Sequence, residues 1–144
     1  MHFITGGAFN GKRVWVKNRY MVTKGDRWLS AYDHAPLPTD LTAMEEDLII
    51  LEGIEIWLKK LTREFNANKC RKIWNSCLGN WLMWERAKVN RKLVVIGTDI
   101  TKGIVPMEKE NRLWRDVTGW AYQDCAKVAE KMEIIWYGIN QTIK

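Results

Sequence analysis

Short, unbroken runs of apolar residues most constrain how this chain can fold. Asp47–Glu52 (DLIILE) and Leu93–Thr98 (LVVIGT) are apolar at consecutive positions instead of alternate ones. This pattern is typical of strands that are buried on both faces of a sheet. Such strands occur in parallel sheets, because the helices that connect parallel strands cover both faces. The sequence therefore predicts an α/β fold, with a mostly parallel sheet and helices on both faces.

The rest of the chain fits the same alternation of strands and helices. Apolar runs are followed by stretches in which apolar residues recur at helical spacing. We predict strands over His2–Thr5, Arg27–Tyr32, Asp47–Glu52, Leu93–Thr98 and Glu133–Gly138. We predict helices over Lys12–Tyr20, Ile54–Phe65, Lys69–Val89 and Leu113–Met132, one or two helical turns within Thr39–Glu46, and a short tail over Ile139–Lys144.

The length of 144 residues fits a single domain, residues 1–144. Apolar residues make up 47% of the chain and charged residues 28%, which excludes a disordered chain. No apolar stretch approaches the roughly 20 residues of a membrane span, and no secretory leader is recognisable. Three cysteines without metal-ligand spacing fit a reducing compartment, so we expect a cytoplasmic protein.

A glycine-rich segment directly follows the first predicted strand. Gly6–Lys12 (GGAFNGK) matches the pattern G-x-x-x-x-G-K between a strand and a helix, the context of a phosphate-binding loop. Glycines let the backbone N–H groups turn inward around a phosphate, and the helix N-terminus adds partial positive charge. Lys12 would then reach the β- and γ-phosphates of GTP or ATP; the alternative is a plain tight turn. We predict a fold of the P-loop NTPase (RecA-like) type. The predicted nucleotide-binding residues are Gly6, Gly7, Ala8, Phe9, Asn10, Gly11, Lys12 and Arg13.

Arg13 departs from the phosphate-loop pattern. The motif normally ends in Ser or Thr, whose hydroxyl binds Mg²⁺, and a guanidinium cannot ligate a metal ion. It can still hold a phosphate through two N–H donors. Two interpretations stay open: a Mg²⁺ site with altered ligands, or a nucleotide pocket that has lost catalysis.

Two carboxylates follow buried strands at the edge where parallel sheets bind ligands. Glu52 ends one strand and Asp99 follows another. An acid at the position of Glu52 holds the metal or its waters in phosphate-loop proteins; the alternative is a salt-bridged structural acid. We predict Lys12, Glu52 and Asp99 as catalytic residues and Glu52 as the metal ligand. Glu55, one helical turn after Glu52, is expected at the surface.

The 23 basic and 17 acidic side chains give a net charge of +6, and they are unevenly distributed. Two basic segments, 11–27 and 59–92, flank an acidic one, 28–58, which suggests a site for an anionic ligand. No recognised nucleic-acid-binding motif accompanies them, so nucleic acid is not expected as a partner. Three of the nine tryptophans, Trp74, Trp81 and Trp84, recur at helical spacing and are predicted to lie in the core.

Several segments together resemble one known family. They are Phe3–Lys12 (FITGGAFNGK), Asp47–Glu52, Leu93–Asp99 (LVVIGTD), Gly103–Pro106 (GIVP), Asn111–Arg112 and Arg115–Asp116. In this order they resemble the adenosylcobinamide kinase / adenosylcobinamide-phosphate guanylyltransferase family of cobalamin biosynthesis. The resemblance implies GTP or ATP as phosphate donor, adenosylcobinamide as acceptor and a homo-oligomer.

The chain resembles a shortened and diverged member of that family. It is shorter between the second and third strands, the region that carries the family's GMP-accepting histidine, and no residue here matches that histidine. The resemblance therefore supports the kinase activity and leaves the guanylyltransferase activity without its key residue. The first hypothesis is a nucleotide-dependent phosphotransferase. The alternatives are a catalytically degenerate nucleotide-binding paralogue and, with least support, a basic, Trp-rich nucleic-acid-binding module.

Overall fold

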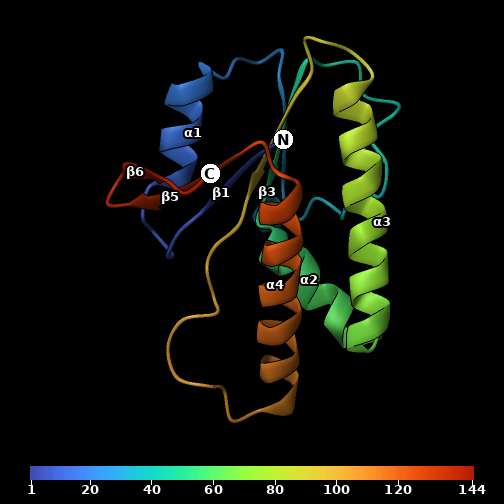
Figure 1. Ribbon diagram of the computed structural model, residues 1–144, viewed down its shortest axis with the longest axis vertical. Coiled ribbons are helices and arrows are strands. Elements are labelled where there is room, and N and C mark those ends of the chain that lie inside the picture. The colour runs from blue at the N-terminus through green and yellow to red at the C-terminus, as the bar shows by residue number, and fades with distance from the viewer.

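The computed structural model describes residues 1–144 as helices packed on a six-stranded sheet (Figure 1). The strand order is β2-β3-β4-β1-β5-β6; the first five strands in this order are parallel to one another, and β6 is antiparallel to β5. The strands are β1 His2–Thr5, β2 Arg27–Ser30, β3 Leu48–Glu52, β4 Lys92–Ile96, β5 Lys131–Trp136 and β6 Ile139–Thr142. The helices are α1 Lys12–Tyr20, α2 Ile54–Glu64, α3 Ala67–Arg86 and α4 Lys109–Val128, with a 3-10 turn, η1, over Ala31–Asp33.

Helices cover both faces of the sheet, but unequally. On one face α2, α3 and α4 pack around a core of 21 buried residues, and on the other α1 packs alone over seven (Figure 1). β3 serves both cores, because Ile49 and Leu51 face the three helices whereas Leu48 and Ile50 face α1. The apolar run in β3 is continuous because helices cover the strand on both faces, as the sequence predicts. The predicted α/β fold with a mostly parallel sheet is confirmed. None of the helices combines the length and apolar character needed to cross a membrane.

The tryptophans of α3 lie in the core, as predicted, and they also fix an irregular segment. Trp74, Trp81 and Trp84 are at most 1% exposed. The indole N–H of Trp81 donates to the carbonyl of Pro38 at 2.7 Å, and that of Trp84 to the carbonyl of Met44 at 3.1 Å. The chain before β3 is thus held by side chains of α3 and contains no helix. The helical turns predicted within Thr39–Glu46 are wrong: the segment forms one hydrogen-bonded turn, in which Met44 donates its N–H to the carbonyl of Leu41 at 2.9 Å, and no helix.

Several predicted boundaries also differ from the structure. β2 ends at Ser30 instead of Tyr32, since η1 turns the chain away from the sheet. α4 begins and ends earlier than predicted, and β5 starts at Lys131. Val128 and Met132 have helical spacing in the sequence, but Val128 ends α4 and Met132 pairs with Phe3 in the sheet.

The C-terminal residues form a strand instead of the predicted tail. β5 and β6 make a hairpin whose turn residues, Tyr137 and Gly138, have φ of 49° and 78°. A two-residue hairpin turn with positive φ at both positions matches the twist of antiparallel strands. The glycine was the sequence signal for this hairpin.

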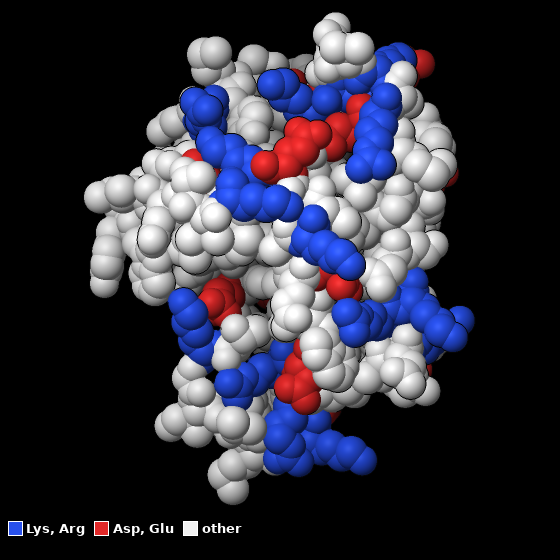
Figure 2. Space-filling model, in the orientation of Figure 1, with Lys and Arg blue, Asp and Glu red and all other residues white.

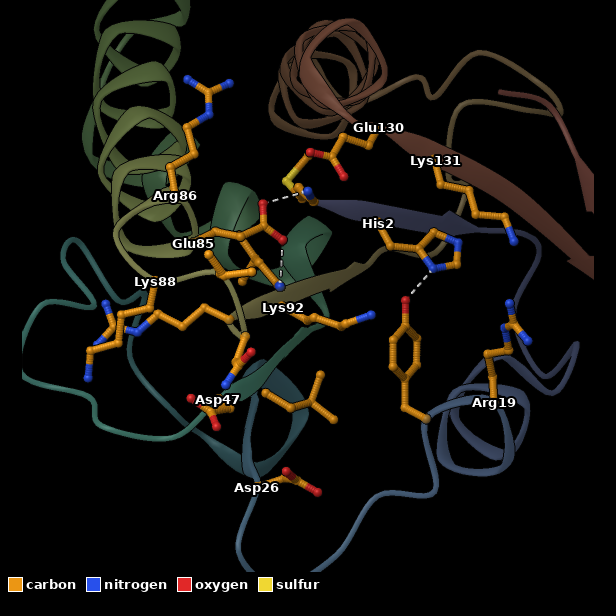
Figure 3. A pocket seen from close by; sticks show the side chains of 17 residues that line it. His2, Arg19, Asp26, Asp47, Glu85, Arg86, Lys88, Lys92, Glu130 and Lys131 are labelled. Carbon is orange, nitrogen blue, oxygen red and sulfur yellow. Dashed lines mark hydrogen bonds and ion pairs between the residues drawn. The ribbon is translucent and has the colours of Figure 1, made fainter.

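His2 begins β1, which lies between β4 and β5, so its side chain is enclosed. Its Nδ1 lies 2.6 Å from the hydroxyl oxygen of Tyr20, and its Nε2 lies 3.0 Å from Glu133. Burial, outweighing the attraction of Glu133, lowers the pKa of His2 to about 4. His2 borders a cleft of about 870 Å³ at the amino ends of the strands (Figure 3). This cleft lies at the opposite edge of the sheet from the glycine-rich loop.

The depressed pKa of His2 predicts a loss of stability in mild acid. The unfolded chain takes up a proton near pH 6.5 that the folded protein excludes until about pH 4. The free energy of unfolding should therefore fall by about 1–2 kcal/mol between about pH 6.5 and about pH 5, with allowance for solvent screening. Denaturant unfolding of the wild type and of His2→Gln measures this contribution. If both proteins lose the same stability over this range, His2 is not its source.

Candidate functional site

The glycine-rich loop joins β1 to α1 at the carboxyl ends of the parallel strands. Gly6 has φ of 144°, and a Cβ there would lie 2.4 Å from the carbonyl oxygen of Ile135 in β5. The loop tip is bound to the β5–β6 hairpin: Gly138 donates its N–H to the carbonyl of Asn10 at 2.8 Å, and Tyr137 to its side-chain oxygen at 3.0 Å. The hairpin that sequence reasoning missed therefore holds the loop.

Lys12, the first residue of α1, is only 9% exposed. Its Nζ donates to the carbonyls of Gly6 at 3.2 Å and Gly7 at 2.7 Å, so the ammonium group lies within the curve of the loop. Burial lowers the pKa of Lys12, while Glu55 and Glu52 oppose that shift. A phosphate held by this loop would meet the ammonium directly.

Arg13, Glu52, Trp28 and Asp33 form one connected cluster beside the loop. Nη2 of Arg13 lies 2.8 Å from Oε2 of Glu52 and 3.1 Å from Oδ2 of Asp33. The indole N–H of Trp28 donates to the same oxygen of Glu52 at 2.9 Å. The guanidinium carbon is also 5.4 Å from the centre of a Trp28 ring, a cation–π contact. Glu52, at 6% exposure, is thus a paired buried carboxylate.

Glu55 lies in the site, and its expected place at the surface is wrong. It is 2% exposed, in the first turn of α2. It accepts hydrogen bonds from the hydroxyl of Tyr32 and from the backbone N–H of Thr98 at 3.0 Å. Tyr122, whose hydroxyl donates to the carbonyl of Thr98 at 2.6 Å, lies 3.4 Å from Glu55. Burial raises the pKa of both tyrosine side chains, so both remain protonated donors.

Sequence reasoning missed Glu55, Tyr32, Thr98 and Tyr122 because they converge from four separate elements or loops. The available signal was Gly53, which has φ of 81°. A glycine between a strand-end acid and a helix permits a tight turn. That turn leaves the first helical turn of α2 beside the end of β4, where Gly53 donates its N–H to the carbonyl of Ile96 at 3.0 Å.

Asp99 reaches the same edge of the sheet, but its carboxylate serves its own loop. Its backbone N–H donates to the carbonyl of Gly6 at 2.9 Å, which brings residue 99 beside the glycine-rich loop. Its Oδ1 accepts from the N–H of Thr101 at 2.9 Å and from the hydroxyl of Thr101 at 2.6 Å. Lys102 lies 3.6 Å from its other oxygen. The structure therefore brings Lys12, Arg13 and Glu52 together and turns the Asp99 side chain toward residues 101–102.

A cavity of about 520 Å³ lies between the loop and the strand ends, a size typical of small-molecule sites. Ala8 to Val14, Tyr32, Glu52, Gly53, Ile96 and Thr98 line it. His34 is not among these lining residues, and His2 lies at the other edge of the sheet.

This cluster, as arranged, does not fit a Mg²⁺ ion. Position 13 offers no oxygen ligand, and the Oε2 of Glu52 is already ion-paired with Arg13 and accepts a hydrogen bond from Trp28. No group of three or more His, Cys, Asp or Glu side chains converges anywhere in the chain. Mg²⁺ requires an octahedron of oxygen ligands, for which the protein usually supplies one or two carboxylates.

The family model described as cobinamide kinase / cobinamide phosphate guanyltransferase matches residues 20–143. The chain belongs to this family. The predicted resemblance is therefore confirmed, and the fold is of the P-loop NTPase type. The search of curated proteins gives no match to an individual protein.

Membership in the cobinamide kinase / guanyltransferase family places the chain in a family of nucleotide-dependent transferases of cobalamin biosynthesis. The matched residues include Glu52, Glu55, Asp99 and the β5–β6 hairpin but begin after the glycine-rich loop. The assignment of residues 6–13 to phosphate binding thus depends on their own geometry.

Replacing Lys12 with Ala tests that geometry. The change removes a charge-assisted contact worth about 1.5–3 kcal/mol, so nucleotide affinity should fall about 10- to 100-fold. Titration with a fluorescent GTP or ATP analogue measures the effect. Lys24→Ala, which removes the same charge from an exposed turn outside the loop, is the matched control. Equal affinity of the Lys12 variant and the control would remove Lys12 from the binding site.

Proposed function

We propose that the chain is a kinase that uses GTP or ATP and phosphorylates the hydroxyl group of a cobinamide, adenosylcobinamide in the first instance. The observation that carries the proposal is the loop of residues 6–13, which follows a central parallel strand and encloses the ammonium group of Lys12 beside a cavity of about 520 Å³. The family assignment supports the same reaction class.

In this proposal the backbone of Gly6–Gly11 and the side chain of Lys12 bind the β- and γ-phosphates. The acceptor oxygen attacks the γ-phosphorus, the bond from that phosphorus to the bridging oxygen breaks, and the nucleoside diphosphate leaves with that oxygen. Phosphoryl transfer of this kind depends on positioning and on neutralising charge. Arg13, held by Glu52, adds positive charge on the side opposite the hairpin.

The proton of the acceptor hydroxyl needs a carboxylate nearby. Glu52 lines the cavity. Glu55 adjoins it, because it accepts hydrogen bonds from two lining residues, Tyr32 and Thr98. Asp99 follows β4 at the same end of the parallel strands. We propose Glu52 as the group that orients the acceptor, with Glu55 as a positioning residue that holds Tyr32 and Thr98. The predicted catalytic role of Asp99 is not proposed further, because Thr101 and Lys102 engage its carboxylate.

We propose the kinase activity without the guanylyltransferase activity. The latter needs a histidine that takes up GMP, and the chain has only His2 and His34. Neither lines the cavity beside the loop.

A single-turnover assay with nucleotide labelled at the γ-phosphate tests the proposal. With adenosylcobinamide present, label should move to the cobinamide, and Lys12→Ala should lose this transfer. With GTP labelled at the α-phosphate, no label should remain on the protein. Absence of transfer from either GTP or ATP, with intact nucleotide binding, would contradict a kinase.

The second candidate function is a nucleotide-binding protein without catalysis, which would bind nucleotide but transfer no phosphoryl group. The contact of Arg13 with Glu52 favours it, because the carboxylate that serves as a metal ligand in phosphate-loop proteins is engaged by a side chain. A nucleic-acid partner is not proposed. On the face drawn in Figure 2, Lys and Arg form separate groups among Asp and Glu instead of one continuous basic stripe.

We further propose that residues 1–144 act as one nucleotide-binding domain in the cytoplasm and that copies of the chain associate. The three cysteines are buried thiols, which is consistent with a reducing compartment. The family assignment is the support for association. Sedimentation of the purified protein measures the oligomeric state.

A further inference from the structure

We propose that Arg13 takes the place of the divalent cation in this site, so that the nucleotide binds without a requirement for Mg²⁺. The proposal depends on the nucleotide-binding function argued above for its ligand. It assigns Arg13 as a phosphate-binding residue and Glu52 as the residue that positions it.

The first argument is the position of Arg13 in the loop. It follows Lys12 directly, where phosphate loops carry the hydroxyl that binds Mg²⁺. Its side chain extends to Glu52, the strand-end carboxylate that would be the second contact of that ion. The two positions through which a phosphate-loop protein would hold the metal ion, 13 and 52, thus form an ion pair with each other here.

The second argument is that the guanidinium is held on three sides. Glu52 and Asp33 lie 2.8 and 3.1 Å from its Nη2, and its central carbon lies 5.4 Å from the centre of a Trp28 ring. Trp28 also donates to Glu52, which fixes the carboxylate itself. A guanidinium held in this way is in place before the ligand binds, so little conformational entropy is lost in ordering its side chain on binding.

The third argument is that donors remain free for a ligand. Both ion-pair contacts of Arg13 use Nη2. Its Nε and Nη1 make no hydrogen bond to the protein, and Arg13, at 45% side-chain exposure, lines the cavity beside the loop. A guanidinium has five N–H donors in a planar fork, so the remaining ones can bind phosphate oxygens.

The fourth argument is charge. A divalent cation brought to Glu52 would lie close to the positive charge of the guanidinium, which is 2.8 Å from Oε2 of that carboxylate, and Lys12 is also close to the carboxylates. Like charges repel, so the built-in cation disfavours binding of the metal ion at this carboxylate.

The test is nucleotide binding measured by calorimetry with Mg²⁺ and with EDTA, using GTP and ATP in turn. The wild type should show affinities that differ by less than about twofold between the two buffers. Arg13→Thr restores the metal-binding hydroxyl and frees Glu52. It should bind about tenfold or more weakly in EDTA, from loss of a charge-assisted contact, and should recover with Mg²⁺.

Two further variants distinguish a specific role of Arg13 from the effect of removing any positive charge from the protein. Arg19→Thr removes the same charge from an exposed position on α1 and should behave like the wild type in both buffers. Glu52→Gln should weaken binding in both buffers alike, because it loosens Arg13 and removes no metal ligand. Circular dichroism checks that each variant is folded.

The outcomes distinguish this proposal from the proposed function. Wild-type affinity that falls about tenfold or more in EDTA, or a Glu52→Gln effect confined to the Mg²⁺ buffer, overturns the role of Arg13 and leaves nucleotide binding intact. Absence of wild-type binding in either buffer overturns both.

Discussion

The close approach of two backbone segments at the carboxyl edge of the sheet is the constraint on which the site depends. Gly6 meets Ile135, Gly11 lies against Gly138, and the tip of the loop accepts N–H groups from the hairpin turn. A side chain at Gly6 would collide with the backbone of β5. Because β5 and β6 fix the loop from one side, Lys12 and Arg13 leave it in defined directions at the start of α1.

Buried charge then accounts for the arrangement on the other side of the loop. Glu52 and Glu55 are both nearly inaccessible, and a buried carboxylate is costly unless it is paired or hydrogen-bonded. Glu52 is satisfied by Arg13 and an indole, whereas Glu55 is satisfied by tyrosine hydroxyls and a backbone N–H. The two acids, close in sequence, thus carry different tasks: one balances a cation and the other joins η1 to the end of β4.

The sequence was sufficient for the parallel sheet and the loop, because both follow from local patterns. Continuous apolar runs indicate strands covered on two faces, and the loop motif needs only a strand before it and a helix after it. Glu55 could not be found this way, since its burial depends on Tyr32, Thr98 and Tyr122 from distant segments. The segment before β3 was misjudged for the same reason: its conformation is set by indoles of α3 that lie about 40 residues away.

Arg13, which stands where phosphate loops carry a hydroxyl residue, contacts the connection that follows β2. That connection begins with η1, which supplies Asp33 to the guanidinium, while β2 itself supplies Trp28 beneath it. Without these partners, Glu52 alone would hold the guanidinium, beside a loop that already contains the charge of Lys12. The arginine and its neighbours are therefore physically coupled: Trp28, Asp33 and Glu52 together keep a cation beside the glycine-rich loop.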